Sequence, residues 1–279
     1  MTGTEPAAQE IDTTRPHPAR VYDWFLGGKD NYPVDERLGR QIAAVDGGGA
    51  PRAARANRAF MHRATRALAE AGIRQFLDIG TGIPTEPNLH QIAQSVAPDA
   101  RVVYVDNDPI VLAHAGALLR GTPEGVTEYV QADARDPHAI LEQAAHVLDF
   151  GRPVALSLIA LLHFVADEDG AHEVVSTLVE ALAPGSCLVL SMMTADFEPE
   201  NVRKGIAAYA AGGVTLVARS RHEVAAFFEG LDLLEPGVVP VDAWRGERAA
   251  DGAGPVSLYG GVGVLRRPAP AGVAHTATR

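Results

Sequence analysis

The residues best suited to chemistry in this chain are acids that stand at the ends of apolar runs. The first, Asp78, lies in the segment Phe76-Leu77-Asp78-Ile79, and a turn that contains Gly80 and Gly82 follows directly. Glycine lets a chain turn sharply and lets backbone amides come close to a ligand, so this segment is typical of a nucleotide-binding loop after a buried parallel strand. A carboxylate at that position could receive a cationic ligand, such as the ammonium group of an amino acid.

Two common nucleotide-binding fingerprints do not fit this turn. A dinucleotide site requires Gly or Ala at the sixth position of Gly-x-Gly-x-x-Gly, and counting from Gly80 that position is Thr85. A Walker phosphate loop requires Gly-Lys-Ser/Thr, and none follows. The remaining pattern is Asp-x-Gly-x-Gly, which makes an NAD-linked oxidoreductase the less favoured function.

Two more acids and one histidine end later apolar runs. Asp106 closes the run that begins at Arg101 and lies 24 residues beyond Gly82, close to where the second strand of a nucleotide-binding unit carries the carboxylate that grips ribose hydroxyls. Asp133 closes a third run. His163 is the only histidine expected at a strand end on this rim. A neutral imidazole there could take a proton from a substrate, or its nitrogens could simply bond to nearby backbone groups.

These side chains need a parallel sheet to bring them together. Apolar runs alternate with helical patterns from residue 76 to residue 194, which predicts an α/β fold with a doubly wound, mostly parallel sheet. The expected strands cover residues 73–79, 101–108, 127–134, 153–161 and 186–192. The expected helices between them cover residues 85–97, 109–120 and 168–183, with Thr85 and Asp167 as caps. Ligands bind at the carboxyl ends of such strands, so the three acids and the histidine should share one rim.

An N-terminal helical arm, residues 16–72, precedes the sheet. It should contain a short helix, a turn at Gly27-Gly28, and helices over residues 34–45 and 52–71. The stretch around the turn is dense in aromatic, glycine and charged residues, which favours a lid over a ligand; aromatics that merely dock the arm on the core are the alternative. The side chains that could contact the ligand are Tyr22, Lys29, Asn31 and Tyr32.

The segments after the parallel sheet are predicted to close the fold. Helices are expected over residues 199–211 and 220–230, the second opened by a capping box from Ser220 to Glu223. Two apolar runs, residues 233–241 and 257–265, fit an antiparallel hairpin at the end of a main domain that covers residues 73–267. Residues 1–15 and 268–279 are polar or rich in small residues, so both are expected to be disordered tails.

The charge balance argues against a large nucleic-acid footprint. Lys and Arg number 24 while Asp and Glu number 35, which gives a net charge of −11, and phosphate contacts need clustered cations. Five arginines recur about every three residues in the expected helix 52–71, which indicates either one solvated helix face or a local basic patch. They are Arg52, Arg55, Arg58, Arg63 and Arg66.

No feature of the sequence indicates a membrane, a disulfide or a metal. Cys187 is the only cysteine and no charged-then-apolar leader opens the chain, so the reducing cytoplasm is the expected location. No apolar run approaches the roughly 20 residues of a membrane span. No His/Cys cluster has the spacing of metal ligands. We therefore expect a soluble, cytoplasmic protein that binds no metal.

Three segments together resemble the class I S-adenosylmethionine-dependent methyltransferases. More closely, they are similar to an actinobacterial S-adenosyl methyltransferase family long catalogued as a domain of unknown function. The resemblance covers roughly residues 16–266 and is carried by residues 19–23 with 26–30, residues 75–85, and residues 101–109. It implies a Rossmann-like methyltransferase sheet.

The resemblance also implies a role for each matching residue. Asp78 and the backbone of Gly80, Thr81 and Gly82 would hold the methionine part of the cofactor. Asp106, with Asn107 beside it, would hold the ribose hydroxyls, and Asp133 with Ala134 the adenine edge. Independently of the resemblance, the composition of the arm makes Tyr22, Lys29 and Asn31 further candidates to contact the cofactor. The chain departs from the wider superfamily at Pro84, where a third glycine is preferred, and this puts the turn geometry after Gly82 in question.

The expected function is therefore transfer of a methyl group from S-adenosylmethionine to a small-molecule acceptor. Direct displacement on the methyl group needs mainly positioning and exclusion of water, so the lack of an evident nucleophile does not count against it. A protein that binds S-adenosylmethionine without catalysis, as a sensor or a degenerate enzyme, fits the same residues and stays an open alternative.

Overall fold

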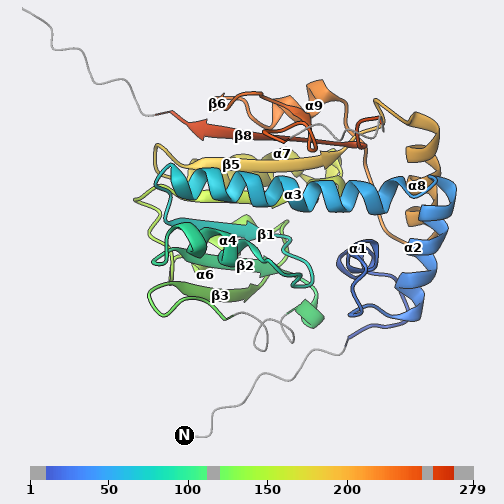
Figure 1. The fold of residues 1–279 in the computed structure, drawn as a ribbon, viewed down its shortest axis with the longest axis horizontal. Coiled ribbons are helices and arrows are strands. Elements are labelled where there is room, and N and C mark those ends of the chain that lie inside the picture. Colours follow the sequence, from blue (N-terminus) through green and yellow to red (C-terminus); the bar gives the residue numbers. More distant parts are fainter. Residues whose placement is uncertain (1–10, 112–119, 247–253, 267–279) are drawn as a thin grey trace, which may run out of the picture.

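A single mixed sheet forms the centre of the computed structural model, which describes residues 11–111, 120–246 and 254–266. The parallel strands are β1 (Gln75–Ile79), β2 (Arg101–Asp106), β3 (Val126–Gln131), β4 (Ala155–Ile159) and β5 (Cys187–Met193), and the others are β6 (Leu231–Leu233), β7 (Val239–Pro240) and β8 (Leu258–Leu265). Their order is β3-β2-β1-β4-β5-β8-β6, with β7 also paired to β8 (Figure 1). The sequence prediction of a doubly wound, mostly parallel sheet is confirmed.

Helices cover both faces of this sheet and one of its ends. They are α1 (Pro18–Leu26), α2 (Pro33–Val45), α3 (Gly49–Glu70), α4 (Leu89–Val96), α6 (Pro137–Ala144), α7 (Ala171–Glu180), α8 (Pro199–Ala211) and α9 (Arg221–Ala226). One apolar core packs α3 and α4 on the sheet through Phe60 and Leu89, and the core on the other face packs α6 and α7 through Ile140 and Val174. The periodic apolar positions of these helices explain the two layers.

The N-terminal helices build a third apolar cluster beside the sheet. Val21 and Phe25 of α1 pack with Leu38 and Ile42 of α2 and with Tyr209 of α8. In Figure 1, α1, α2 and α8 lie together at one end of the sheet, the end to which the parallel strands point. Segments far apart in the sequence therefore meet over the carboxyl ends of the strands.

Three helix starts differ from the sequence predictions, and one of them is that of α3, which begins at Gly49 instead of residue 52. The helix expected from Thr85 begins at Leu89, because Asn88 and Gln91 form a capping box and Pro87 precedes it. The helix expected from residue 168 begins at Ala171, after a short 3-10 turn. Asp167 therefore caps nothing; its carboxylate instead lies 2.6 Å from the guanidinium of Arg219.

The C-terminal hairpin is present in a modified form. The run expected as one strand over residues 233–241 is split into β6 and β7, which both pair with β8 in antiparallel fashion. Pro236 has no N–H to donate to a neighbouring strand, and Gly237 has a φ of +80°. The chain therefore turns between β6 and β7. β8 also pairs with β5 and thereby joins the hairpin to the parallel sheet.

Several other expectations have clear outcomes. The helices predicted over residues 34–45 and 52–71 are confirmed as α2 and α3, and the capping box from Ser220 to Glu223 opens α9. Most of the helix expected over residues 109–120, and most of both expected tails, lie outside the described residues. None of the helices in the described part of the chain combines the length and apolar character that a membrane span requires.

Candidate functional site

A cavity of about 400 Å³, here named the rim cavity, lies at the carboxyl ends of β1, β2 and β4. Residues of the N-terminal arm, of α3 and of the loops after the strands line it. It brings together most of the residues that the sequence singles out for cofactor binding: Tyr22, Asp78, Gly80, Thr81, Gly82, Asp106, Asn107, Asp133 and Ala134. The three acids of the rim predicted from strand order thus meet in one concave site, whereas His163, expected on the same rim, does not line it.

The glycine turn after β1 requires glycine at both positions. Gly80 and Gly82 have φ values of +74° and +68°, a region that side chains disfavour. A Cβ on Gly80 would also lie 2.6 Å from the side chain of Leu161. With Pro84 in place of a third glycine, the turn still folds back against β2, because Gly80 N donates to Val105 O at 2.8 Å.

Asp106 holds this turn to the end of β2. Its Oδ2 accepts the amide N–H of Gly82 at 2.7 Å and its Oδ1 accepts that of Asp108 at 3.0 Å. The side chain is buried, and burial raises its pKa. Each carboxylate oxygen can still accept another hydrogen bond, so the geometry suits a pair of neighbouring hydroxyl donors.

Asp78 is a buried carboxylate with no ion pair among the described residues. Only 8% of the residue is exposed. Burial raises the pKa of Asp78 to about 6, and the nearby positive charge of Arg58 opposes that rise. A cationic ligand in the rim cavity would therefore stabilise the ionised form of Asp78.

Arg58 is a residue of the rim cavity that the sequence analysis placed only in a stripe of arginines. Its guanidinium donates to the backbone oxygens of Thr85 and, at 3.0 Å, of Pro87. Its Nε is buried without a hydrogen-bond partner. The signal was available in the spacing, because Arg58 follows Ala54 by four residues and precedes Met61 by three, and both of those are buried on one face of α3.

Asp133 lies at the more exposed end of the rim cavity. The guanidinium of Arg135 donates two hydrogen bonds to its carboxylate, from Nε at 2.9 Å and from Nη2 at 2.6 Å. These hydrogen bonds lower the pKa of Asp133. Ala134 follows it on the cavity wall. Any partner of this carboxylate must share it with Arg135.

Tyr22 reaches the site through a chain of hydrogen bonds. Its hydroxyl donates to Ala54 O at 3.1 Å and accepts from Asn57 Nδ2 at 3.1 Å. The amide oxygen of Asn57 accepts from Ser191 Oγ at 2.6 Å, and Ser191 Oγ accepts the N–H of Ala160 at 3.0 Å. This series of hydrogen bonds connects α1, α3 and β5 to the loop after β4.

Three other arm residues, Lys29, Asn31 and Tyr32, do not line the rim cavity. The Asn31 side chain donates to Asp23 Oδ2 at 2.8 Å and to Gly28 O at 3.2 Å, which fixes the turn after α1. Lys29 is exposed. Closing over the cofactor, the role that the composition of the arm favours for these residues, would require the arm to rearrange.

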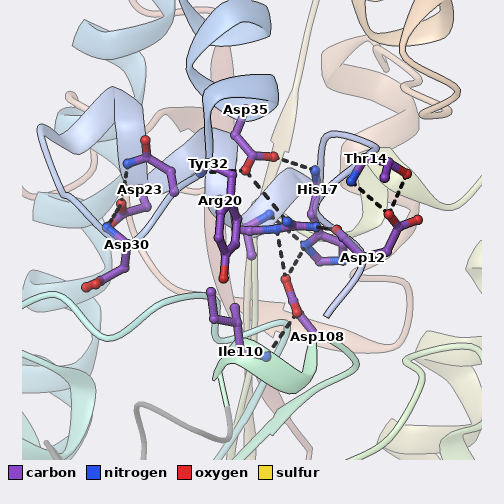
Figure 2. Close-up of polar contacts among 12 residues, drawn as sticks. Asp12, Thr14, His17, Arg20, Asp23, Asp30, Tyr32, Asp35, Asp108 and Ile110 are labelled. Carbon is purple, nitrogen blue, oxygen red and sulfur yellow. Dashed lines mark hydrogen bonds and ion pairs between the residues drawn. The ribbon is translucent and has the colours of Figure 1, made fainter. Parts of the chain in front are cut away.

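A buried ionic cluster holds the arm against the loop after β2 (Figure 2). The guanidinium of Arg20 lies 3.4 Å from Asp108 and 3.7 Å from Asp35, and His17 Nδ1 lies 3.0 Å from Asp108. Arg20, Asp35 and Asp108 are each at most 4% exposed. Asp108 is two residues from Asp106, so the cluster fixes the arm next to the rim cavity.

His163 lines a second, smaller cavity of about 100 Å³, here named the side cavity. Its Nδ1 accepts the backbone N–H of Met193 at 3.3 Å, and burial lowers its pKa to about 3. The ring is therefore neutral with its proton on Nε2, and Nε2 can donate a hydrogen bond but cannot accept a proton. This tautomer does not suit the role of general base considered for His163.

The two cavities adjoin one another. They share the wall residues Pro18, Tyr22, Ala160 and Phe164. Ala160, directly after β4, has a φ of +53°, which is uncommon for a residue with a side chain. Within the described residues, no group of three His, Cys, Asp or Glu side chains could hold a metal ion.

Comparison with known proteins agrees with this geometry. The model of a family described as S-adenosyl methyltransferase matches residues 4–266. A solved protein of the DUF574 family from Streptomyces avermitilis is 51% identical over 92% of this chain and 100% of its own, with a TM-score of 0.89. A candidate methyltransferase from Thermobifida fusca is 39% identical over 92% of this chain and 97% of its own, with a TM-score of 0.85.

More distant matches extend only to the fold. An S-adenosylmethionine-dependent methyltransferase from Anabaena variabilis is 13% identical over 71% of this chain and 80% of its own, with a TM-score of 0.51. No curated protein matches the chain.

Proposed function

Because the chain belongs to the S-adenosyl methyltransferase family, we propose that it transfers the methyl group of S-adenosylmethionine to a small-molecule acceptor and that the rim cavity holds the cofactor. S-adenosylmethionine is the cofactor of this family and of this chain. The observation that carries the proposal is the meeting of Asp78, Asp106 and the Gly80 to Gly82 turn in one cavity.

The polar groups of the rim cavity fit the charges of this cofactor. The buried Asp78 carboxylate, which lacks an ion pair among the described residues, would bind the ammonium group of the methionine part. Arg58, with its unpartnered Nε, would bind the methionine carboxylate. The negative charge of Asp78 and the positive charge of Arg58, both in the rim cavity, would thus match the ammonium and carboxylate groups of an amino acid.

The remaining residues would hold the nucleoside. Asp106 would accept hydrogen bonds from the two ribose hydroxyls, and Asn107 lies beside it on the wall. Asp133 and Ala134 would contact the adenine edge. Gly82 leaves room for the ligand at the turn, since a Cβ there would approach only Ala19, at 3.9 Å.

The residues of the chain would promote the reaction by position. When bound, S-adenosylmethionine supplies a methyl group on a sulfonium sulfur; an acceptor lone pair bonds to the methyl carbon as the carbon–sulfur bond breaks, and its electron pair stays on sulfur. Tyr22 and Phe164 would orient the acceptor, and α1 would exclude water. A proton lost by a hydroxyl or amine acceptor would pass to solvent.

Calorimetry and turnover test this proposal. We expect S-adenosylhomocysteine to bind and NAD to give no heat of binding, and we expect methyl-labelled cofactor to lose its label to an acceptor from cell extract. Binding of NAD without any response to S-adenosylhomocysteine would refute the proposal. Binding of S-adenosylhomocysteine without turnover for any acceptor would favour the alternative of a protein that binds the cofactor without catalysis.

A further inference from the structure

We propose that the side cavity binds the methyl acceptor, and that it selects a small, mostly apolar molecule with a hydrogen-bond acceptor near one end and an amino group at the other. The inference rests on the proposed function in one respect, because it takes the rim cavity as the cofactor's site. The shared wall of Pro18, Tyr22, Ala160 and Phe164 places a molecule in the side cavity directly beside the rim cavity.

The size and walls of the side cavity limit what can enter. Most of the lining is apolar, with Phe25, Ile42, Met193, Leu216 and Leu258 among the contributors. Its volume of about 100 Å³ is smaller than the roughly 150 Å³ of an apolar cavity that holds benzene. The enclosed part of a ligand should therefore contain at most about six non-hydrogen atoms, the number in benzene.

Polar groups without partners line the side cavity, and one of them, on His163, lies toward the rim cavity. His163 is 5% exposed, its Nδ1 is occupied by Met193, and its Nε2 has no hydrogen-bond partner among the described residues. Its neighbour Phe164 belongs to the wall shared with the rim cavity. Ser257 Oγ, also in the lining, is buried without a partner. Buried donors are costly when unpaired, so a ligand oxygen that accepts from them would be favoured.

An acidic group marks the far end. On α3, Gly49 and Ala54 line the side cavity and Arg58 lines the rim cavity, so a rise of about 1.5 Å per residue puts Gly49 about 13 Å from Arg58 along the helix. A Cβ on Gly49 would lie 3.7 Å from Glu198 Oε2. Glu198 is therefore at the end remote from the cofactor.

Charge at that end favours a cation. The carboxylate of Glu198 has no ion pair or hydrogen bond among the described residues, whereas that of Asp46 accepts the amides that begin α3. Among the described residues of the lining, Arg52 is the one cationic side chain, and it donates to Gly254 O at 2.7 Å. A ligand amino group would bind Glu198 with a charge-assisted hydrogen bond, while a ligand carboxylate would meet two carboxylates.

Methionine methyl groups can report the two cavities separately. Met193 lines the side cavity, Met61 lines the rim cavity, and the fully buried Met192 serves as an internal reference. The full chain would be labelled with carbon-13 at its methionine methyl groups and titrated with 5-aminopentan-1-ol, pentylamine and pentanoate. S-adenosylhomocysteine should shift the Met61 signal. The amino alcohol should shift the Met193 signal most strongly, pentylamine less strongly, and pentanoate not at all.

Variants assign the contacts. Glu198→Gln should weaken binding of the amino alcohol about tenfold, the loss expected when a charged hydrogen bond becomes a neutral one. His163→Leu should remove the advantage of the amino alcohol over pentylamine, and His163→Gln, which keeps an N–H donor, should restore part of it. Gly205→Leu should fill the side cavity, since Gly205 lines it and a Cβ there meets no atom within 4 Å. Lys204→Leu, one position away and exposed, is the matched control.

The outcomes separate this inference from the proposed function. If Met61 responds to S-adenosylhomocysteine but Met193 responds to none of the three probes, or if Gly205→Leu leaves the Met193 response intact, the side cavity is not the acceptor's site and the proposed function stands. Tighter binding of pentanoate than of the amines would overturn the assigned class of ligand. A Met193 response without any Met61 response would refute the proposed function instead.

Discussion

The buried carboxylate of Asp78 should make cofactor binding depend on pH. Its pKa of about 6 in the free protein should fall when a ligand ammonium group binds beside it, because the cation favours the ionised form. The affinity for S-adenosylhomocysteine should therefore be highest above pH 6 and should fall about tenfold per pH unit below it. Calorimetry from pH 5 to pH 7.5 measures this, and an affinity that is constant over that range would contradict it.

Asp78→Asn is the matched variant for this titration, since it keeps the shape and removes the ionisation. It should bind the cofactor more weakly and without the pH dependence. In the free protein the sign is reversed. A pKa raised by burial stabilises the fold only while the group is protonated, so the contribution of Asp78 to the free energy of unfolding is present below the ordinary aspartate pKa of the unfolded chain and is lost as pH rises through about 6.

Asp106 offers a second test at the level of one side chain. Asp106→Ala should cost roughly 1.5–3 kcal/mol of cofactor binding, the range for hydrogen bonds to a charged group. Some of that loss would come through the turn, because Asp106 also accepts the amide of Gly82. Asp99→Ala, an exposed acid that precedes β2, is the control and should leave the dissociation constant unchanged. A normal dissociation constant for Asp106→Ala would assign Asp106 a structural role only.

The sequence indicates the acids of the rim cavity more directly than it indicates Arg58. Asp78 and Asp106 end neighbouring parallel strands, so strand order alone brings them to one rim. Arg58 reaches the same cavity because of how α3 is rotated on the sheet. The regular spacing of the arginines does not by itself show which of them faces the cavity and which face solvent. Arg55 and Arg66 of the stripe are indeed exposed, as expected of a solvated face.

At the level of elements, α1 depends on the buried charges around Arg20. Arg20→Met would leave Asp35 and Asp108 buried without their cation, and breaking such a pair costs about 3–5 kcal/mol. We expect hydrogen exchange of the α1 amides to accelerate while β1 keeps its protection. Arg40→Met removes an exposed pair with Glu36 and should change the free energy of unfolding by less than about 1 kcal/mol.

Hydrogen exchange also tests the predicted lid. If the arm closes over the cofactor, protection from Arg20 to Tyr32 should rise when S-adenosylhomocysteine is added, since ordering a segment requires contacts that offset the entropy of the free chain. Equal protection with and without the ligand would mean that α1 is a fixed wall. The hydrogen-bond chain from Tyr22 to Ala160 already gives α1 a structural role.

Over the whole molecule, a contact is harder to predict from the sequence when the segments that form it lie farther apart along the chain. The alternating core from β1 to β5 follows from local periodicity and turn residues. The side cavity forms where α1, α2, α3 and α8 converge with the loops after β4, and no spacing in the sequence specifies how these helices pack. Glu198 and Gly205 therefore carried no signal that could be recognised before the fold was known.

Deletion of residues 1–32 tests whether these residues are needed for the fold of the sheet or only for cofactor binding. The two apolar cores on the faces of the sheet contain no residue of α1, which packs instead in the cluster with α2 and α8. The sheet should therefore stay folded. Cofactor binding should weaken, because Pro16, His17, Pro18, Ala19 and Tyr22 form one wall of the rim cavity.

The deletion also leaves a built-in reporter of the sheet. The chain has two tryptophans, and removal of Trp24 leaves only Trp244, which is fully buried against Phe60 with ring centroids 5.4 Å apart. We expect the truncated protein to keep the emission of a buried tryptophan and a cooperative unfolding transition while losing affinity for S-adenosylhomocysteine. Emission typical of an exposed tryptophan would mean that the arm is needed for the fold itself. An intact sheet with unchanged affinity would mean that residues 1–32 only cover α2 and α8 and contribute nothing to the cofactor's site.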